Sequence, residues 1–352
     1  MIDFIKREKI YIVILFFIVS VFILRIGYKE KVQTVEKNKP ISSMTFQEAG
    51  ITQQKVKGYF AAGGLKPIIF KSMIIVGFFV FMAGLVSNIL FIMQKIRNNF
   101  RGGGKDAGVD SSTMVKRKVP WGINDIIRAT VILIFISYLV SIVQAFFLKI
   151  FDMQISTNLR MITGTFLIDM SAVLVIFYFT IIKYKEKIAL LGLKLSSFLK
   201  NVFYGIKGYI FILPSLFFIL LICVWILDIL GYTPPEQPVL EIFMQEKRGG
   251  IILFLTFFVS IFGPIVEEMF FRGFMYTAIR KNAGFGWAAF ISAFVFSLLH
   301  ANIVGFLPIL ALGFFLAYLY ERTGSLITSM TVHIVHNSFV IGFVFFVKEL
   351  VS

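Results

Sequence analysis

The most regular feature of the chain is the recurrence of long apolar stretches separated by short charged segments. Nine stretches can be marked, at about 10–26, 68–93, 126–148, 161–182, 207–231, 251–279, 285–303, 305–320 and 325–347. A transmembrane α-helix needs about 20 mostly apolar residues, and runs of about that length recur along the whole chain. The pattern therefore predicts an all-α fold, a polytopic transmembrane helical bundle with about 8–9 membrane spans.

Composition agrees with this prediction and excludes soluble protein classes. The 352 residues are 58% hydrophobic and have a mean hydropathy of +0.87. The net charge of +16 does not indicate nucleic-acid binding, because the basic residues sit in short loops between spans, where they set topology and contact anionic lipid. The single cysteine, Cys223, lies inside a span. An internal disulfide and a cysteine-based metal site are therefore excluded.

The distribution of positive charge predicts the orientation. Basic residues precede the first apolar stretch and no small-residue cleavage site follows it, which favours an uncleaved first span. With the N-terminus in the cytoplasm, most lysine and arginine residues of the short loops fall on the cytoplasmic side. We expect a multi-pass protein of a bacterial plasma membrane with a cytoplasmic N-terminus.

Three regions are predicted along the chain. Residues 1–94 form an N-terminal extension of two spans with an outer loop at 27–67, and residues 95–119 form a basic, flexible cytoplasmic linker. Residues 120–352 form the core, in which 183–206 has the apolar spacing and lysines of a short helix at the inner interface. No internal repeat is evident, which counts against an inverted-repeat transporter.

Charged residues inside the stretch 251–279 are the strongest functional signal. Charge at bilayer depth costs at least a few kcal/mol per group, so Glu267, Glu268 and Arg272 need partners. Glu268 and Arg272 are four residues apart and can pair on one helix face. Glu267 is rotated by roughly 100° from Glu268 and has no such partner, which leaves it free for chemistry.

The three histidines all follow this helix. Measured at about 1.5 Å per residue from the predicted cytoplasmic ends, Glu267, His300 and His333 lie roughly 20, 21 and 14 Å deep and can meet inside the bilayer. Asn337 shares a helix face with His333, whereas His336 is turned away from His333 by about 60° and is adjacent to that face. Phe296, four residues before His300, is placed to form one wall of the site.

Two chemistries suit this set of side chains. A carboxylate with a histidine can hold and deprotonate water, while a histidine and an amide donate hydrogen bonds to the oxyanion formed on a peptide carbonyl. Alternatively, Glu267, His300 and His333 could bind zinc, whose water becomes the nucleophile. Serine or cysteine hydrolysis is disfavoured, because no Gly-x-Ser-x-Gly motif is present. Asp169, inside another span, is expected to make a structural hydrogen bond.

Three motifs then resemble a known family. They are Glu267-Glu268-x-x-x-Arg272, Phe296-x-x-x-His300 and His333-x-x-x-Asn337. Their order and spacing are similar to those of the CPBP family (CAAX protease and bacteriocin-processing enzymes, also called Abi), which includes type II CAAX prenyl endopeptidases. The resemblance covers about residues 120–350.

This resemblance implies an intramembrane endopeptidase. Glu267 would activate water with His300, and His333 with Asn337 would stabilise the oxyanion. Glu268 and Arg272 would shape the site, although Glu268 is sometimes counted as catalytic. Family members are often labelled metalloproteases, so the cofactor stays open between none tightly bound and a divalent metal such as zinc.

The substrate and two other function classes also stay open. The Lys-, Ile- and Phe-rich composition favours a bacterial enzyme that processes a peptide, a bacteriocin-like precursor or a membrane protein. The alternatives are a non-catalytic membrane protein, acting in bacteriocin immunity or as a regulatory scaffold, and a proton-coupled transporter. The sequence leaves the oligomeric state undetermined.

Overall fold

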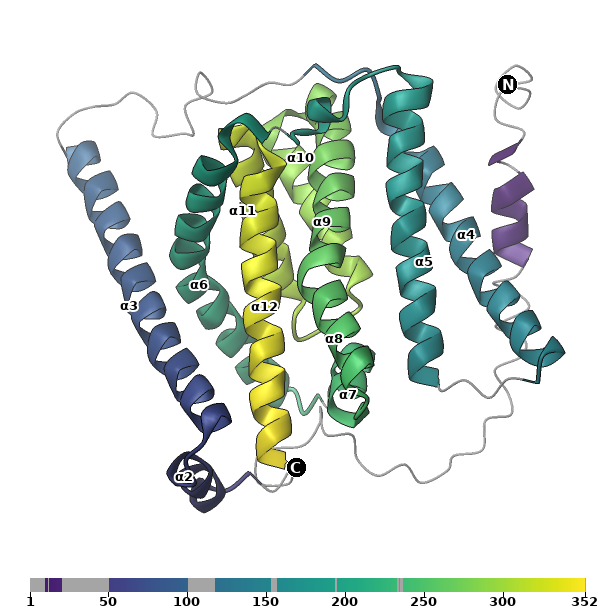
Figure 1. The fold of residues 1–352 in the computed structure, drawn as a ribbon. Coiled ribbons are helices and arrows are strands. Elements are labelled where there is room, and N and C mark those ends of the chain that lie inside the picture. The colour runs from purple at the N-terminus through teal and green to yellow at the C-terminus, as the bar shows by residue number, and fades with distance from the viewer. Residues whose placement is uncertain are drawn as a thin grey trace.

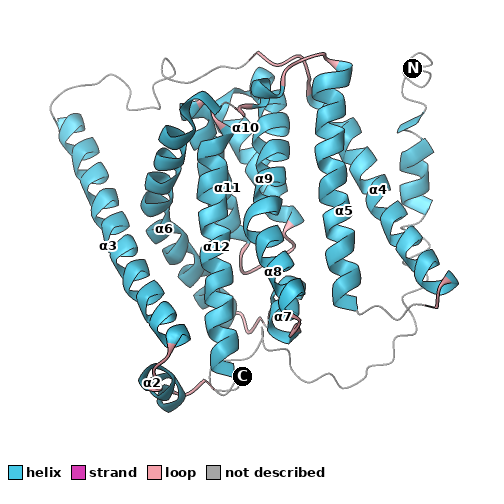
Figure 2. Cartoon of the chain, in the orientation of Figure 1, coloured by secondary structure: helices cyan, strands magenta, loops and turns pink. Residues whose placement is uncertain are grey.

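The described part of the chain is almost entirely helical. The computed structural model describes residues 10–11, 13–20, 51–100, 118–152, 157–193, 195–232, 234 and 237–351, and contains no strand within them (Figure 2). The predicted all-α fold is therefore confirmed. Residues 21–26 of the first expected span, 27–50 of the outer loop and 101–117 of the linker lie outside the described residues.

Long α-helices account for most of the structure. They are α3 (Leu65–Phe100), α4 (Ile123–Ile150), α5 (Thr157–Phe177), α6 (Phe198–Ile229), α10 (Thr277–Leu299), α11 (Phe306–Thr323) and α12 (Leu326–Val351). Between α6 and α10, the shorter α8 (Gly249–Phe257) and α9 (Gly263–Glu268) belong to one continuous helical segment. Two short helices, α2 (Gln53–Ala61) and α7 (Pro238–Gln245), lie at one end of the bundle (Figure 1). Three π-helical segments interrupt or extend the long helices: η3 (Tyr178–Lys183), η6 (Phe258–Phe262) and η7 (Met269–Tyr276).

The number of membrane-crossing helices differs from the prediction. Within the described residues, seven helical segments are long and apolar enough to cross a membrane, rather than eight or nine. The predicted stretches 251–279 and 285–303 fall in one such segment, Gly249–Leu299, although its backbone leaves helical geometry at Gly284, where φ is +71°. The first predicted span is described only in part.

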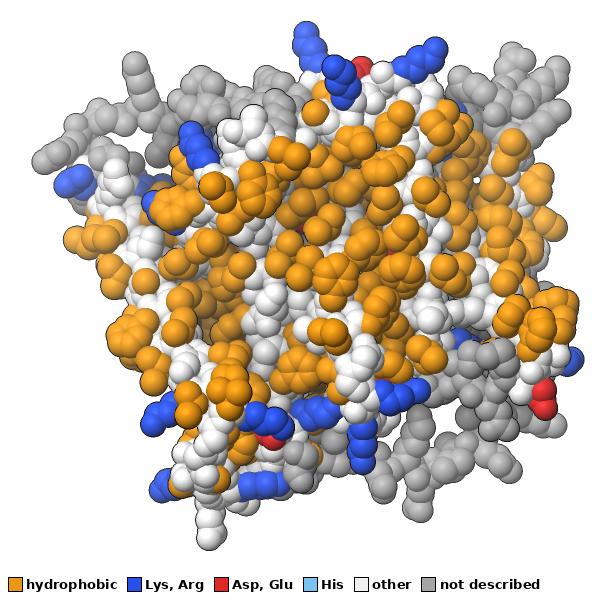
Figure 3. Space-filling view, in the orientation of Figure 1, with side chains coloured by type: hydrophobic (Ala, Val, Ile, Leu, Met, Phe, Trp, Pro, Cys, Tyr) orange, Lys and Arg blue, Asp and Glu red, His pale blue; other side chains and the backbone are white. Residues whose placement is uncertain are grey.

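The bundle has a central group of helices with others at its sides. Helices α6 and α9–α12 pack together in the centre, with α3 on one side and α5 and α4 on the other (Figure 1). On the face shown in Figure 3, apolar side chains cover the middle and most lysine and arginine side chains lie toward the two ends. Together with the seven apolar helices, this distribution indicates a multi-pass membrane protein. The orientation of its N-terminus stays a prediction.

A proline in α6 creates the docking site for the N-terminal extension. Pro214 has no N–H to donate to the Ile210 carbonyl one turn earlier. Helix α3 approaches at this point, where a Cβ added to Gly84 would lie 2.2 Å from that carbonyl oxygen. Asn88 of α3 donates a hydrogen bond to the neighbouring Phe211 carbonyl at 2.8 Å. The extension is therefore packed on the core through a close, polar contact.

The prediction of an interfacial helix at 183–206 is wrong. The segment forms two 3-10 turns, η4 (Ile188–Leu191) and η5 (Leu195–Ser197), and its end already belongs to α6. Gly192, at φ +107°, reverses the chain after η4. Its carbonyl accepts a hydrogen bond from the Leu326 N–H, so the segment is tied to the turn between α11 and α12 rather than lying separately in the interface.

Candidate active site

The two glutamates lie between two π-helical segments of one continuous helix. In η6, the Gly263 N–H bonds to the carbonyl of Phe258, five residues earlier. The next N–H in that register would come from Pro264, which has none, so the Val259 carbonyl loses its partner. Asn337 of α12 supplies the missing donor, and its Nδ2 lies 3.0 Å from this carbonyl oxygen. π-helical segments are frequent at functional sites, and here the proline and the asparagine together account for one.

Glu268 is the buried anchor of the site. Its side chain is 0% exposed and accepts a hydrogen bond from Arg272 Nη1 at 2.7 Å, as predicted from their spacing. The hydroxyl of Ser329 lies beside the same carboxylate. Ser329 was not predicted, although it precedes His333 by four residues and so shares its helix face. The guanidinium of Arg272 therefore balances the charge of this buried carboxylate.

Arg272 connects three helices. Its Nη2 donates to the Gly313 carbonyl of α11 at 3.1 Å, and its guanidinium lies 4.5 Å from the centroid of the Phe296 ring. A Cβ added to Gly313 would lie 3.3 Å from the same guanidinium and 3.0 Å from the Cβ of Ala293. The glycine therefore permits the close approach of α10, α11 and the arginine, a requirement that the motifs did not reveal.

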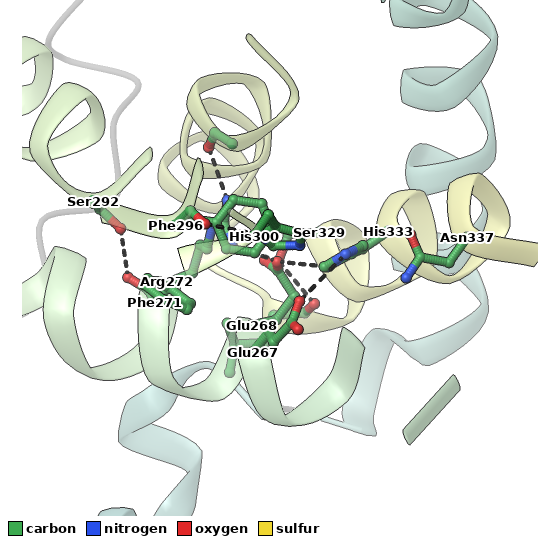
Figure 4. A network of polar contacts seen from close by, with 12 residues as sticks. Glu267, Glu268, Phe271, Arg272, Ser292, Phe296, His300, Ser329, His333 and Asn337 are labelled. Carbon is green, nitrogen blue, oxygen red and sulfur yellow. Dashed lines mark hydrogen bonds and ion pairs between the residues drawn. The ribbon is translucent and has the colours of Figure 1, made fainter. Parts of the chain in front are cut away.

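One imidazole lies between both carboxylates (Figure 4). His333 Nδ1 is 3.1 Å from Glu268 Oε1, and its Nε2 is 3.5 Å from Glu267 Oε2. The histidine side chain is only 2% exposed, whereas that of Glu267 is 33% exposed. The first contact is a hydrogen bond and the second is a looser electrostatic contact. Glu267 is therefore the accessible carboxylate of the pair.

His300 reaches the same region from the end of α10. Its Nδ1 lies 2.7 Å from the Phe296 carbonyl oxygen, which can only accept, so Nδ1 carries the proton and Nε2 keeps a free lone pair. The Phe296 ring lies 4.5 Å from the His300 ring and 5.6 Å from that of His333, centroid to centroid. Phe296 is thus the shared wall of the site, in the place expected from the sequence.

Two other residues are placed less centrally. His336 packs edge-to-face on Tyr209 of α6, with centroids 6.0 Å apart, and its Nδ1 has no partner within the described residues. It therefore lies on a different side of α12 from the carboxylates. Asp169 of α5 lies close enough to Glu267 for their charges to interact. The hydrogen bond expected for Asp169 is not observed among the described residues.

The suggested zinc ligands do not fit a metal in this arrangement. Of the two histidines suggested as ligands, His333 directs both ring nitrogens at carboxylates, and His300 has one ring nitrogen unoccupied. Over the described ranges, no group of three or more His, Cys, Asp and Glu side chains is arranged to hold one ion.

Glu267, Glu268, Arg272, His300 and His333 form a polar cluster. The comparisons with known proteins match the part of the chain that contains it. Residues 249–339 match the family model of the Rce1-like type II CAAX prenyl endopeptidases. We call residues 249–339 the Rce1-like segment because of this similarity. It contains all three motifs, from Glu267 to Asn337, so the resemblance drawn from them is confirmed over these residues. The Rce1-like segment is shorter than the expected core, and the helices before α8 lie outside it.

Curated relatives match the chain over similarly limited lengths. YdiL of Bacillus subtilis (strain 168) is 37% identical over 82 residues, which are 23% of this chain and 34% of the relative. The membrane-embedded CAAX protease MroQ of Staphylococcus aureus (strain USA300) is 35% identical over 25% of this chain and 38% of the relative. YaiF of Lactococcus lactis subsp. lactis is 35% identical over 29% of this chain and 49% of its own length. The matches thus span less than half of each relative, and no solved structure matches the chain.

Proposed function

We propose that this chain is an intramembrane endopeptidase in which Glu267 activates water for attack on a peptide bond. The observation that supports this most directly is the unequal environment of the two glutamates. Glu268 is buried and paired with Arg272, whereas Glu267 is partly exposed and lies 3.5 Å from His333. Two adjacent carboxylates with different environments are suited to different roles, one structural and one chemical.

In the proposed reaction, a water molecule lies between Glu267 and the free Nε2 of His300. Glu267 takes one proton as the water oxygen attacks the peptide carbonyl carbon, and later gives that proton to the leaving amine. The second proton of the water bonds to His300 during the attack. The remaining N–H of the Asn337 carboxamide donates to the developing oxyanion. His333 does so in its imidazolium form, because its Nδ1–H donates to Glu268 and only the charged ring also carries an N–H on Nε2. No metal is needed for these steps.

The proposed substrate is a peptide, a bacteriocin-like precursor or a membrane protein that presents a bond at bilayer depth. Support comes from the Rce1-like segment and from the placement of the cluster within membrane-spanning helices. The similarity to MroQ, which is named a membrane-embedded CAAX protease, points to the same class of reaction.

The test is peptide cleavage by the purified protein in liposomes, with products identified by mass spectrometry. Glu267→Gln should reduce the rate by at least about 10²- to 10⁴-fold, the usual contribution of a general base. Glu241→Gln in α7, far from the cluster in sequence, is the matched control and should keep full activity. Full activity of Glu267→Gln would overturn the proposal and favour a structural role for the cluster, as in an immunity protein or scaffold.

A second measurement separates the two chemistries left open by the sequence. Cleavage in the presence of a strong chelator should proceed at the rate measured without it. A loss of cleavage that added zinc restores would refute the metal-independent mechanism, while leaving the assignment as a peptidase intact.

A further inference from the structure

The π-helical segment η7 ends at a carbonyl that the helix backbone cannot pair. Within η7 an N–H bonds to the carbonyl five residues back, whereas in α10 it bonds four residues back. The change at Thr277 therefore leaves one carbonyl without a backbone donor. The Thr277 hydroxyl donates to the Gly273 carbonyl at this junction, at 2.7 Å. Because both residues are buried and an unpaired buried carbonyl is costly, this register depends on donors from side chains.

A tryptophan from outside this helix completes the junction. Trp121 precedes α4, and its Nε1 lies 3.0 Å from the Thr277 hydroxyl oxygen and 3.1 Å from the Phe274 carbonyl oxygen. An indole N–H can only donate, so the hydroxyl accepts from it and keeps its own hydrogen for Gly273. Trp121 is 0% exposed, and its ring packs on that of Phe274 with centroids 5.5 Å apart. The indole therefore supplies both a donor and packing at the end of η7.

The backbone that carries Trp121 is itself held in place. The N–H of Gly122, the next residue, donates to the Asp125 carboxylate at 3.0 Å. The same carboxylate accepts a hydrogen bond from the Tyr184 hydroxyl at 2.6 Å and pairs with Lys183 at the end of η3. The indole is thus attached to a fixed point outside the helix that it contacts.

The register of η7 determines where Glu268 lies. After η7, the start of α10 is fixed on α11, because Tyr276 and Arg280 both donate to Glu321. If η7 returned to α-helical bonding, the part of the helix before it would rotate by about 100° relative to this fixed part. Such a rotation would separate Glu268 from the His333 imidazole, which now lies 3.1 Å away.

We propose that Trp121 is a positioning residue of the site, whose N–H holds η7 in the register that places Glu268 against His333. Asn337 has the same relation to η6, since it donates to the carbonyl that η6 leaves unpaired. Each π-helical segment beside the glutamates is thus fixed by a side chain from another element. Trp121 precedes residues 249–339, so part of what shapes the site lies outside the Rce1-like segment. The inference rests on the proposed function only for its effect on catalysis.

Peptide cleavage in liposomes, measured per folded protein, tests that effect. Benzothienylalanine at position 121 keeps the double ring and replaces the N–H by sulfur, and Trp121→Phe is the second variant. In both, kcat should fall by about 10- to 100-fold, since a misplacement of about 1 Å can have that effect. KM should stay within about twofold, because the buried indole does not contact the peptide. Trp287→Phe, at a tryptophan that is 67% exposed, is the control and should change neither constant.

A second measurement does not depend on cleavage. The chain has three histidines, so labelling with nitrogen-15 histidine gives an NMR spectrum of three imidazoles, which His333→Gln and His336→Gln assign. The Nδ1 resonance of His333 reports its hydrogen bond to Glu268. It should move by more than its linewidth in the benzothienylalanine protein. The His336 resonances should stay, because that ring packs on Tyr209 instead.

Three results would overturn the inference: a wild-type kcat in the benzothienylalanine protein, an unchanged His333 resonance, or equal movement of the His336 resonances, which would indicate a general loss of packing. If the wild-type protein cleaves no peptide, the proposed function fails, and the His333 resonance alone decides the role of Trp121.

Discussion

Arg272 offers the sharpest test of how the site is held together. Replacing it with methionine keeps an unbranched apolar stem but leaves Glu268, which is 0% exposed, without its cation. Removing one partner of a buried ion pair typically costs about 3–5 kcal/mol. The lost hydrogen bond to the Gly313 carbonyl adds about 1 kcal/mol. We therefore expect Arg272→Met to lower the free energy of unfolding by about 4–6 kcal/mol.

The double variant Glu268→Gln/Arg272→Met separates two effects on stability: the unpaired charge of Glu268 and the packing lost with the arginine side chain. With both charges removed, about 2 kcal/mol or more should be regained relative to Arg272→Met alone, because the amide is cheaper to bury than an unpaired carboxylate. The assay is equilibrium unfolding in mixed micelles by titration with denaturing detergent. If the double variant is no more stable than Arg272→Met, the buried pair is not what holds these helices, and the reasoning fails. Both variants should lose peptidase activity, since His333 depends on Glu268.

Three smaller tests address other contacts. Gly313→Ala should destabilise the protein by about 1–3 kcal/mol through overpacking. Gly286→Ala is the control, because an added Cβ there contacts no other atom, and it should be neutral or stabilising. Thermal unfolding of both variants in detergent measures the difference. Asn88→Leu should cost about 0.6–1.7 kcal/mol by removing the bond between α3 and α6, and an unchanged unfolding midpoint would contradict the docking described above. Hydrogen bonds from Arg248 lower the pKa of Glu246, in the loop before α8, from 4.5 to about 2. Its stabilising effect is thus present above pH 4.5 and lost as the pH falls toward 2, so Glu246→Gln should lower the unfolding temperature at pH 6 and have no effect near pH 2.

The sequence was most informative where a rule of spacing applied. The apolar runs identified the long helices, and four-residue spacing identified the pair Glu268–Arg272 and the wall formed by Phe296. Features that depend on contacts between distant segments were not predictable in this way. The π-helical register around the glutamates and the role of Gly313 are examples, because both follow from how α11 and α12 pack against the helix that carries Glu267.

The segment 183–206 shows another limit of spacing. Helical apolar spacing is present there, but it contains no information on where the chain turns, and Gly192 takes a left-handed conformation after η4. The break at Gly284, in contrast, falls between the predicted stretches 251–279 and 285–303.

The bond between Asn337 and the Val259 carbonyl has a consequence for the mechanics of the molecule. Helix α12 is attached to the glutamate helix at two levels, by His333 between the two carboxylates and by Asn337 a turn further along. A slip of α12 by one residue would rotate it by about 100° and break both attachments together. A shift of α12 along its axis therefore cannot remove one of these two contacts and keep the other. The side chains of the site are held together only when α12 is in register with the glutamate helix.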